Sequence, residues 1–251
     1  MSFFSKIFNI GNSKNRGGNN FPLAFLEVDM HNHILPGIDD GSASVENSLS
    51  LIEGMKSLGI HKFVATPHIL QGLYPNDKGS IQGAYKVLQS HLDTTTKVFA
   101  AAEHMIDEGL DQLIMNNNLC EMPQKYVLIE MSFLAPSVSL FDAILNLQNL
   151  GYTPILAHPE RYLYYKSDLS IYNSIKDAGC LLQLNLLGVS SYYGTEVQKT
   201  AQYLLKRGMY DFVGTDLHHH KHLDAIQRVC AKYNLEDLVN KCTIRNTSLY
   251  F

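Results

Sequence analysis

Histidines and carboxylates recur along this chain in groups, and these are side chains that bind divalent metals. The groups are His31 with His33, then His68, Glu103, Glu130, His158, and Asp216 with His218. The intervals are 37 residues from 31 to 68, 35 to 103, 27 to 130, 28 to 158 and 58 to 216. Imidazole and carboxylate together suit manganese, iron or zinc. The set exceeds the three or four protein ligands of one zinc site, so it is large enough for two or three metals that share carboxylates.

Two of these groups have the spacing of neighbouring side chains on one face of a strand. In a strand, residues i and i+2 point to the same side. We therefore expect His31 to point with His33, and Asp216 to point with His218, so that each pair chelates. His104 follows Glu103 directly, so we expect it to point the other way and to be structural.

Each group follows a short apolar run that is expected to be a β-strand. Most of the runs are almost continuously apolar, as strands buried on both faces of a parallel sheet must be. The seven runs are residues 25–30, 62–66, 98–102, 126–131, 153–157, 181–186 and 211–215. The sixth ends in Asn185, for which two roles are open: hydrogen bonding to a ligand or substrate, and helix capping.

Amphipathic stretches lie between these runs and predict helices. They cover residues 44–58, 79–92, 107–117, 138–150, 170–178 and 195–207. Glycines at 59, 151, 179 and 208 stand where helix C-caps belong. Alternation of strand and helix predicts an α/β fold with a parallel sheet. Seven such units favour a closed or nearly closed barrel over an open sheet.

The carboxyl ends of barrel strands are where active sites are built. Six of the seven predicted strands end in a His, Asp or Glu, and the intervals equal one strand plus one helix, or two such units in the last case. Any one of these residues alone could be a helix cap or a loop residue. Their recurrence in phase with the predicted strands indicates a shared site.

The composition limits the class of protein. A chain of 251 residues fits one large α/β domain or two small ones, and the length favours one. The hydrophobic fraction of 45% is enough for a sizeable core. The net charge of −4 does not provide the excess positive charge with which proteins bind a nucleic-acid backbone. The four cysteines have no zinc-ribbon or C-x-x-C spacing, so we expect free thiols in a reducing, cytoplasmic compartment. No apolar run approaches the roughly 18–20 residues of a membrane span.

Residues 1–20 are expected to be a flexible extension, and residues 21–251 a single catalytic domain. The extension has phenylalanines and isoleucines near helical spacing, followed by a stretch rich in Gly, Asn and basic residues. It lacks the features of a secretory signal. A disordered tail and a membrane-surface anchor are both open, and membrane contact is expected only through this segment.

Several further polar residues adjoin the predicted strand ends. In the loop Asp39-Asp40-Gly41, either aspartate could form a local turn or cap, or fold back towards His33. Tyr162 follows Arg161, and both stacking on an aromatic substrate and simple loop packing are open. The residues after His218 read His-His-Lys-His, where His219, His220 and His222 could orient ligands, donate protons or form a solvated loop.

Together these residues resemble the polymerase-and-histidinol-phosphatase (PHP) family. The segments VDMHNHILPGIDDG, ATPH, AAEH, IEMSF, AHPERY and GTDLH are similar to its branch of bacterial protein-tyrosine phosphatases associated with capsule and exopolysaccharide synthesis. The resemblance runs from about Glu27 to His218. It implies a distorted seven-stranded, TIM-like (β/α)7 barrel and a centre of three divalent metals, with manganese expected and iron or zinc as alternatives.

The resemblance also implies roles for individual residues. His31 and His33 look like ligands of one metal, together with Asp216. Glu103 looks like a bridging carboxylate, with Glu130 and His158 on a second metal. The third metal's ligands look like Asp40, His68 and His218. Arg161 in the HPER motif resembles the family's phosphate-binding arginine, and we assign catalytic roles to Arg161, Asp216 and His218.

The chain departs from the family pattern after its last Asp-x-His. The family often has a second arginine there, whereas this chain has His219, His220, Lys221 and His222. We expect Lys221 and His222 to contact the substrate, together with Arg161 and Tyr162. A lysine offers a point charge rather than the two-pronged hydrogen bonding of an arginine.

The expected reaction is hydrolysis of phosphotyrosine, in which a metal-bridging hydroxide attacks phosphorus in line. By resemblance, the substrate is the tyrosine-rich tail of a bacterial tyrosine kinase. The chain has no C-x5-R motif of the cysteine phosphatases. Two alternatives remain. The first is a small-molecule phosphoesterase such as a histidinol phosphatase, whose site is expected to be deeper. The second is a barrel without catalysis, but such proteins usually lose metal ligands, and none of the expected ligands is missing here.

Overall fold

The computed structural model describes residues 21–251, so the predicted extension 1–20 lies outside the described residues. The described part contains nine strands, which are β1 (Val28–Asn32), β2 (Lys62–Ala65), β3 (His68–Ile69), β4 (Lys97–Ala100), β5 (Glu103–Met105), β6 (Tyr126–Glu130), β7 (Thr153–Ala157), β8 (Leu181–Asn185) and β9 (Phe212–Gly214). All their pairings are parallel. The predicted α/β class with a parallel sheet is therefore confirmed.

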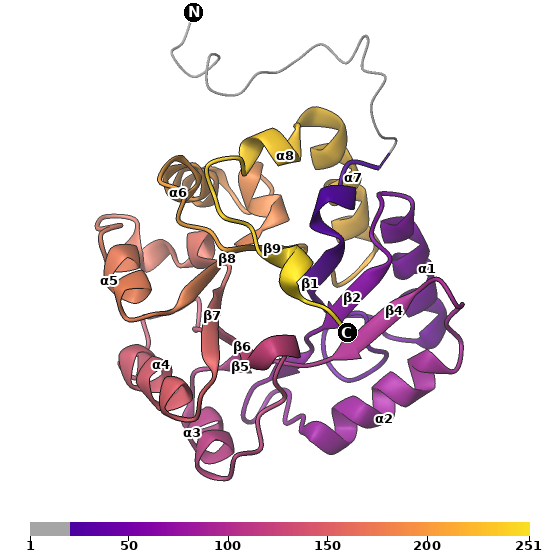
Figure 1. Cartoon of the computed structure of the whole chain (residues 1–251), viewed down its shortest axis with the longest axis horizontal. Coiled ribbons are helices and arrows are strands. Elements are labelled where there is room, and N and C mark those ends of the chain that lie inside the picture. The colour runs from indigo at the N-terminus through magenta and orange to yellow at the C-terminus, as the bar shows by residue number, and fades with distance from the viewer. Residues whose placement is uncertain (1–20) are drawn as a thin grey trace, which may run out of the picture.

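Helices connect these strands and surround them (Figure 1). The α-helices are α1 (Val45–Lys56), α2 (Lys78–Gln89), α3 (Glu108–Met115), α4 (Leu140–Asn149), α5 (Ile171–Asp177), α6 (Thr195–Lys206), α7 (His220–Lys232) and α8 (Leu235–Leu238). The first six match the predicted helices to within three residues at each end. Helix α7 was not predicted, and residues 220 and 222 belong to its first turn rather than to a loop.

The strands form two hydrogen-bonded sheets that curl around a common centre (Figure 1). One has the order β1-β2-β4 and the other the order β3-β5-β6-β7-β8-β9. The chain between β9 and α7 runs beside the end of β1, where the His33 amide donates to the Leu217 carbonyl at 2.9 Å. The Asp216 amide also donates to the His31 carbonyl at 2.7 Å.

Two predicted strands end early, and each is followed by a short strand that was not predicted. Residues 62–66 were expected as one strand, but β2 ends at Ala65 and pairing resumes at His68, after Pro67. A proline has no amide hydrogen and so interrupts a ladder. The neighbouring strand breaks at the same level, between β4 and β5, so the two halves fall into different sheets. The first strand also begins later than predicted, because residues Ala24–Leu26 form a 3-10 turn.

The strands are buried on both faces, as their apolar runs predicted. One face packs on the helices in a large cluster that includes Leu51, Ile144 and Leu182. The other face contributes Met30, Leu128 and other strand residues to a smaller cluster that contains no residue from helices α1–α8. This smaller cluster therefore lies inside the curl of the strands and supports the residues at their carboxyl ends.

Two further observations bear on the predicted class of protein. Among residues 21–251, no helix combines the length and the apolar character needed to span a membrane. The four cysteines, all of which lie in this part of the chain, are free thiols.

Candidate metal centre

The last residues of β1 and the turn after β9 bring two histidines and one aspartate together. The Nε2 atoms of His31 and His33 lie 3.3 Å apart, so the two rings point together as predicted. Asp216 Oδ1 lies 3.4 Å from each of these nitrogens. All three side chains are at least 98% buried. Two imidazole nitrogens and a carboxylate oxygen therefore face one point.

Glu103, at the start of β5, lies at the middle of the predicted ligands. Its Oε2 is 3.1 Å from His31 Nε2 and 3.2 Å from His68 Nδ1. Its Oε1 is 3.0 Å from His158 Nε2. A carboxylate that faces three histidines with both oxygens has the placement expected of a bridging ligand.

Glu130 is the last residue of β6, and His158 directly follows β7, the next strand of the same sheet. Glu130 Oε1 lies 2.8 Å from His68 Nδ1, whereas its Oε2 lies 4.0 Å from His158 Nε2. The pair predicted from the resemblance is thus brought to the same side of Glu103. In this structure, however, the histidine nearest to Glu130 is His68.

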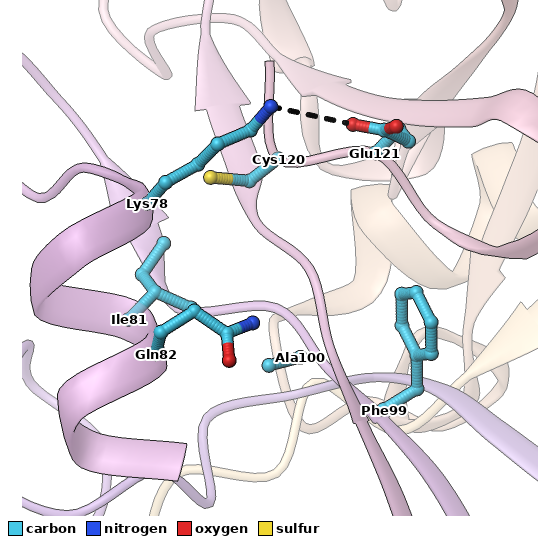
Figure 2. A pocket seen from close by; sticks show the side chains of 7 residues that line it. All are labelled: Lys78, Ile81, Gln82, Phe99, Ala100, Cys120 and Glu121. Carbon is cyan, nitrogen blue, oxygen red and sulfur yellow. Dashed lines mark ion pairs between the residues drawn. The ribbon is translucent and has the colours of Figure 1, made fainter. Parts of the chain in front are cut away.

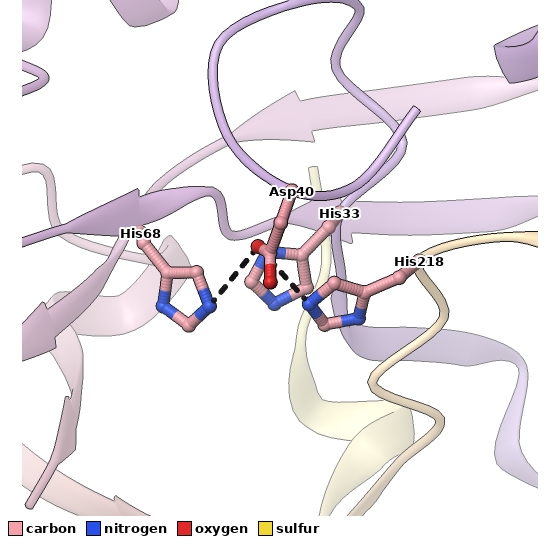
Figure 3. A group of neighbouring side chains, drawn as sticks. All are labelled: His33, Asp40, His68 and His218. Atoms are coloured by element: carbon pink, nitrogen blue, oxygen red, sulfur yellow. Dashed lines mark ion pairs between the residues drawn. The ribbon is translucent and has the colours of Figure 1, made fainter. Parts of the chain in front are cut away.

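Asp40 reaches over the centre from the loop after β1 (Figure 3). Its Oδ1 lies 3.6 Å from His68 Nε2 and 3.5 Å from His218 Nε2. His33 lies beside these three residues, and its ring stacks on that of His218 with centroids 3.9 Å apart. The side chain of Asp40 is 52% exposed, so this is the open side of the site.

The nine predicted ligands therefore converge, and we call them the His/carboxylate cluster. Three overlapping sets could each hold a cation, since one ligand atom from every member lies within 4.8 Å of the others. These sets are His31, His33, Glu103 and Asp216; His33, Asp40, His68 and His218; and His68, Glu103 and Glu130. His158 adjoins the third set through Glu103.

Neighbouring polar groups fix the orientation of the ligands. Asp39 accepts a hydrogen bond from His33 Nδ1 at 2.7 Å and from the His68 amide at 3.2 Å. Of the two aspartates considered, Asp39 therefore orients His33 and Asp40 joins the cluster. Asn185 donates to Asp216 Oδ2 at 2.9 Å and also accepts from the Leu187 amide, so both roles left open for it are present.

Gln183 is a supporting residue that the sequence analysis missed. Its Oε1 lies 2.9 Å from His31 Nδ1 and accepts from the His158 amide at 3.2 Å. The available signal was its position two residues before Asn185 on β8, which places both side chains on the same face. Its acceptor oxygen holds the proton on His31 Nδ1 and leaves Nε2 free for a metal.

Two members of the cluster have strained backbones. His158 has φ of 34° and Asp216 has φ of 54°, both in the left-handed region. Residues other than glycine seldom adopt this conformation, and it concentrates at functional sites. Here it turns both side chains back over the strand ends.

Arg161 lies beside the cluster in the 3-10 turn Pro159–Arg161. Its Nη1 donates to Asp216 Oδ2 at 2.8 Å, and its side chain is 22% exposed. Its guanidinium carbon lies 4.3 Å from the ring centre of Phe133 and 4.4 Å from that of Tyr193. The planar cation is therefore fixed by one ion pair and two aromatic contacts.

The other predicted substrate contacts occupy different positions. Tyr162 is a core residue, because it is 1% exposed and its hydroxyl accepts a hydrogen bond from the Met131 amide. This corrects its expected contact with substrate. His222 packs against His218, with ring centres 5.3 Å apart, and Lys221 is exposed on the first turn of α7. Their substrate contacts stay predictions.

His104 and His219 have structural roles in this fold. His104 is buried and bonds to the Leu128 carbonyl and the Cys120 amide, on the opposite side from Glu103 as predicted. His219 caps α7 by accepting a hydrogen bond from the His222 amide.

The electrostatics of the cluster are those of buried carboxylates that stabilise positive charge beside them. Burial acts to lower the pKa of His31, but Glu103 and Asp216 raise it to about 9. Burial raises the pKa of Glu130, and the neighbouring Glu103 raises it further. Two carboxylates buried this close repel each other, and a divalent cation between them removes the repulsion.

Unsatisfied nitrogens also fit a metal. His158 Nδ1 and His68 Nδ1 are buried without a hydrogen-bond partner. For His68, two carboxylate oxygens lie within 3.2 Å, yet they do not have hydrogen-bond geometry with it. The Nδ1 atom of His68 therefore converges with these two carboxylates as in the third candidate set, whereas its Nε2 faces Asp40 as in the second set, which is the set that the resemblance implies.

A separate pocket lies between α2 and β4 (Figure 2). It has a volume of about 250 Å³ and is lined by Lys78, Ile81, Gln82, Phe99, Ala100, Cys120 and Glu121. It shares no residue with the His/carboxylate cluster. The pKa of the Cys120 thiol is raised to about 12 by burial, so this pocket lacks a reactive thiolate.

The fold and the site together define a parallel α/β protein with a buried His/carboxylate cluster beside an arginine. The chain belongs to the family described as "Capsular polysaccharide synthesis, CpsB/CapC", whose profile matches residues 27–249. It is similar to the tyrosine-protein phosphatase YwqE of Bacillus subtilis, with 27% identity over 198 residues, which cover 77% of this chain and 78% of YwqE.

Solved structures agree with this membership. One of them comes from a description of the crystal structures of YwqE from Bacillus subtilis and CpsB from Streptococcus pneumoniae as unique metal-dependent tyrosine phosphatases. It aligns with this chain with a TM-score of 0.73 and 25% identity. It covers 86% of this chain and 96% of that chain. A histidinol phosphate phosphatase from Lactococcus lactis aligns with a TM-score of 0.54 and 14% identity, over 82% of this chain and 93% of that one. The latter shows a shared fold.

Proposed function

We propose that this chain is a metal-dependent protein-tyrosine phosphatase. Its substrate would be phosphotyrosine on a bacterial tyrosine kinase that regulates capsule or exopolysaccharide synthesis. The observation that carries the proposal is the convergence of nine His, Asp and Glu side chains beside the cationic Arg161. The names of the relatives support the choice of phosphotyrosine.

Three divalent cations, most simply Mn²⁺, would be held by the His/carboxylate cluster. His31, His33 and Asp216 would bind the first, Glu130 and His158 the second, and Asp40, His68 and His218 the third, with Glu103 shared. When bound, such cations offset the charge of a phosphate monoester and lower the pKa of water towards neutrality.

The chain's own residues would position the phosphoryl group. Arg161 can donate two parallel hydrogen bonds to phosphoryl oxygens, and its contacts with Phe133 and Tyr193 keep it from folding away. His218 Nδ1 lies 2.8 Å from the Asp216 carbonyl, which leaves Nε2 to face the open side of the site. The leaving phenolate of tyrosine has a pKa of about 10 and needs little help from a general acid.

We propose that the strands around this site form a seven-stranded barrel. We infer that β2 with β3, and β4 with β5, each count as one interrupted barrel strand. The Ala101 amide donates to the Ala65 carbonyl at 2.8 Å and the Glu103 amide to the Pro67 carbonyl at 3.1 Å, which links the neighbours across both breaks. The contacts between β1 and the chain after β9 would then close the ring, within a single domain that spans residues 21–251.

A comparison of substrates tests this function. The Mn²⁺-loaded protein is given a phosphotyrosine peptide, the same peptide with phosphoserine, and histidinol phosphate. We expect the highest kcat/KM for the phosphotyrosine peptide. Glu103→Gln, which removes the charge of the shared carboxylate, serves as the inactive control. A higher kcat/KM for histidinol phosphate would contradict the proposal in favour of a small-molecule phosphatase.

A further inference from the structure

Phe133 is an exposed aromatic residue at the wall of the candidate site. It lies three residues after Glu130, in the loop between β6 and α4, and 45% of its surface is exposed. Leu134 and Val138 in the same loop are exposed as well, and contiguous exposed apolar surface often marks a ligand-binding groove. The position of this ring relative to the cluster therefore needs a reason.

The ring of Phe133 contacts both parts of the site. Its centre lies 4.3 Å from the guanidinium carbon of Arg161, the residue proposed to bind phosphate. It also lies 5.4 Å from the ring centre of His158, a member of the His/carboxylate cluster. A group attached to a phosphate held by Arg161 would therefore leave the site alongside this ring.

The loop that carries Phe133 is apolar and has no charged side chain. No charged residue occurs between Glu130 and Asp142 in the sequence. Leu134 and Val138 in the same loop are 94% and 99% exposed. Within this loop a charged amine would find no partner, whereas a phenyl ring would find the exposed aromatic surface of Phe133.

We propose that Phe133 determines specificity for aryl phosphates, by packing against the phenyl ring of the phosphotyrosine while Arg161 binds the phosphate. The inference rests on the proposed function and adds to it the residue that selects the aryl group. Aromatic pairs favour offset or edge-to-face contact, and such pairs add to the affinity beyond the area that they bury.

A pair of non-hydrolysable ligands isolates the aryl group. Phenylphosphonate and methylphosphonate carry the same anionic head and differ in the ring alone. Calorimetry on the Mn²⁺-loaded protein gives the ratio of their Kd values. We expect the wild type to prefer phenylphosphonate, and Phe133→Ala to reduce that preference about three- to tenfold. Phe133→Leu, which keeps apolar volume, should fall between them. Leu145→Ala, which changes an exposed leucine of α4 outside this loop, should keep the wild-type ratio.

The outcomes separate the inference from the function on which it rests. An unchanged ratio in Phe133→Ala, or a wild type without the preference, would overturn the role of Phe133. An equal loss of affinity for both ligands would overturn it as well, since Phe133 would then act only by holding Arg161. If the wild type shows the Phe133-dependent preference but does not hydrolyse a phosphotyrosine peptide, the proposed function is overturned while aryl recognition by Phe133 is supported.

Discussion

Arg161 is the side chain that connects the His/carboxylate cluster with the proposed phosphate-binding position. It donates to Asp216, a predicted metal ligand, and lies against two aromatic rings. A planar guanidinium can satisfy all these contacts at once, because its donors lie in the plane and its faces remain free to stack. An ammonium group has no such faces.

The substitution Arg161→Lys tests this geometry. The charge is kept, but the paired donors and the stacking plane are lost, so we expect kcat/KM for a phosphotyrosine peptide to fall about 10–100-fold. Bound metal, measured by elemental analysis, should stay at the wild-type level. Arg207→Lys is the matched control, since Arg207 also stacks on a tyrosine, Tyr203, away from the site. Wild-type kinetics in Arg161→Lys would refute the role of the paired donors of Arg161.

Asp39 is the second residue with a specific expectation. Asp39→Asn keeps the size of the side chain but removes the charge that faces His33 Nδ1 at 2.7 Å. Loss of such a partner typically weakens metal binding about 10–100-fold. Titration of the stripped protein with Mn²⁺ measures this effect. Asp107→Asn, at the cap of α3, is the control and should bind Mn²⁺ like the wild type. Equal Mn²⁺ affinity in Asp39→Asn would show that Asp39 only shapes the loop.

Residue types and spacing were sufficient to single out eight of the nine members of the His/carboxylate cluster, because each of the eight lies in a strand or within four residues of one. Asp40 lies further along the loop after β1 and was assigned through the resemblance. Gln183 could not be recognised, because an amide on a buried strand has no distinctive chemistry until the fold brings it to His31. Tyr162 was misplaced for a related reason. Its neighbour Arg161 faces the site, but the 3-10 turn sends the next side chain into the core.

At the scale of elements, the loop after β1 depends on a close approach of two backbones. A Cβ added to Gly41 would lie 2.2 Å from the His33 carbonyl oxygen and 2.4 Å from its Cβ. Neither neighbour is the end of a flexible side chain. The loop that carries Asp39 and Asp40 can therefore lie on His33 only because residue 41 is glycine.

Gly41→Ala should displace this loop. We expect a loss of about 1–3 kcal/mol of stability, as in other overpacked sites, together with weaker Mn²⁺ binding. Urea unfolding measures the first effect and metal titration the second. Gly83→Ala in α2 meets nothing within 4 Å, so as a control it should stabilise the protein by about 0.5–1 kcal/mol. A fully stable Gly41→Ala with unchanged Mn²⁺ binding would contradict the close approach.

Element types were largely predictable, whereas breaks within strands were not. Apolar runs and glycine caps located six helices and the strands, and Gly59 and Gly151 have the positive φ values expected of C-caps. Pro67 signals the break after β2 in the sequence. The matching break after Ala100 has no such signal, because it arises only where β4 pairs with the interrupted strand. Helix α7 has buried Leu223, Ile226 and Val229 at helical spacing, but the histidines at its start obscured this pattern.

At the scale of the whole molecule, the buried carboxylates link metal binding to folding. Glu103, Glu130 and Asp216 are at least 97% buried and close to one another. A cation that binds only the folded state adds about 2.7 kcal/mol of stability at 100 times its Kd. For a domain of this size we expect Mn²⁺ to raise Tm by about 5–10 °C. A Glu103→Gln control should show a smaller rise, and a Tm that does not respond to Mn²⁺ would argue against a metal in this cluster.

The most direct test of the central claim measures metal content and phosphotyrosine hydrolysis on the same protein. The chain is stripped with a chelator, assayed with a phosphotyrosine peptide, and then titrated with Mn²⁺ while bound metal is counted. We predict that hydrolysis is lost on stripping and returns as Mn²⁺ binds, reaching a plateau near three ions per chain. Full hydrolysis by protein without detectable metal would contradict the account.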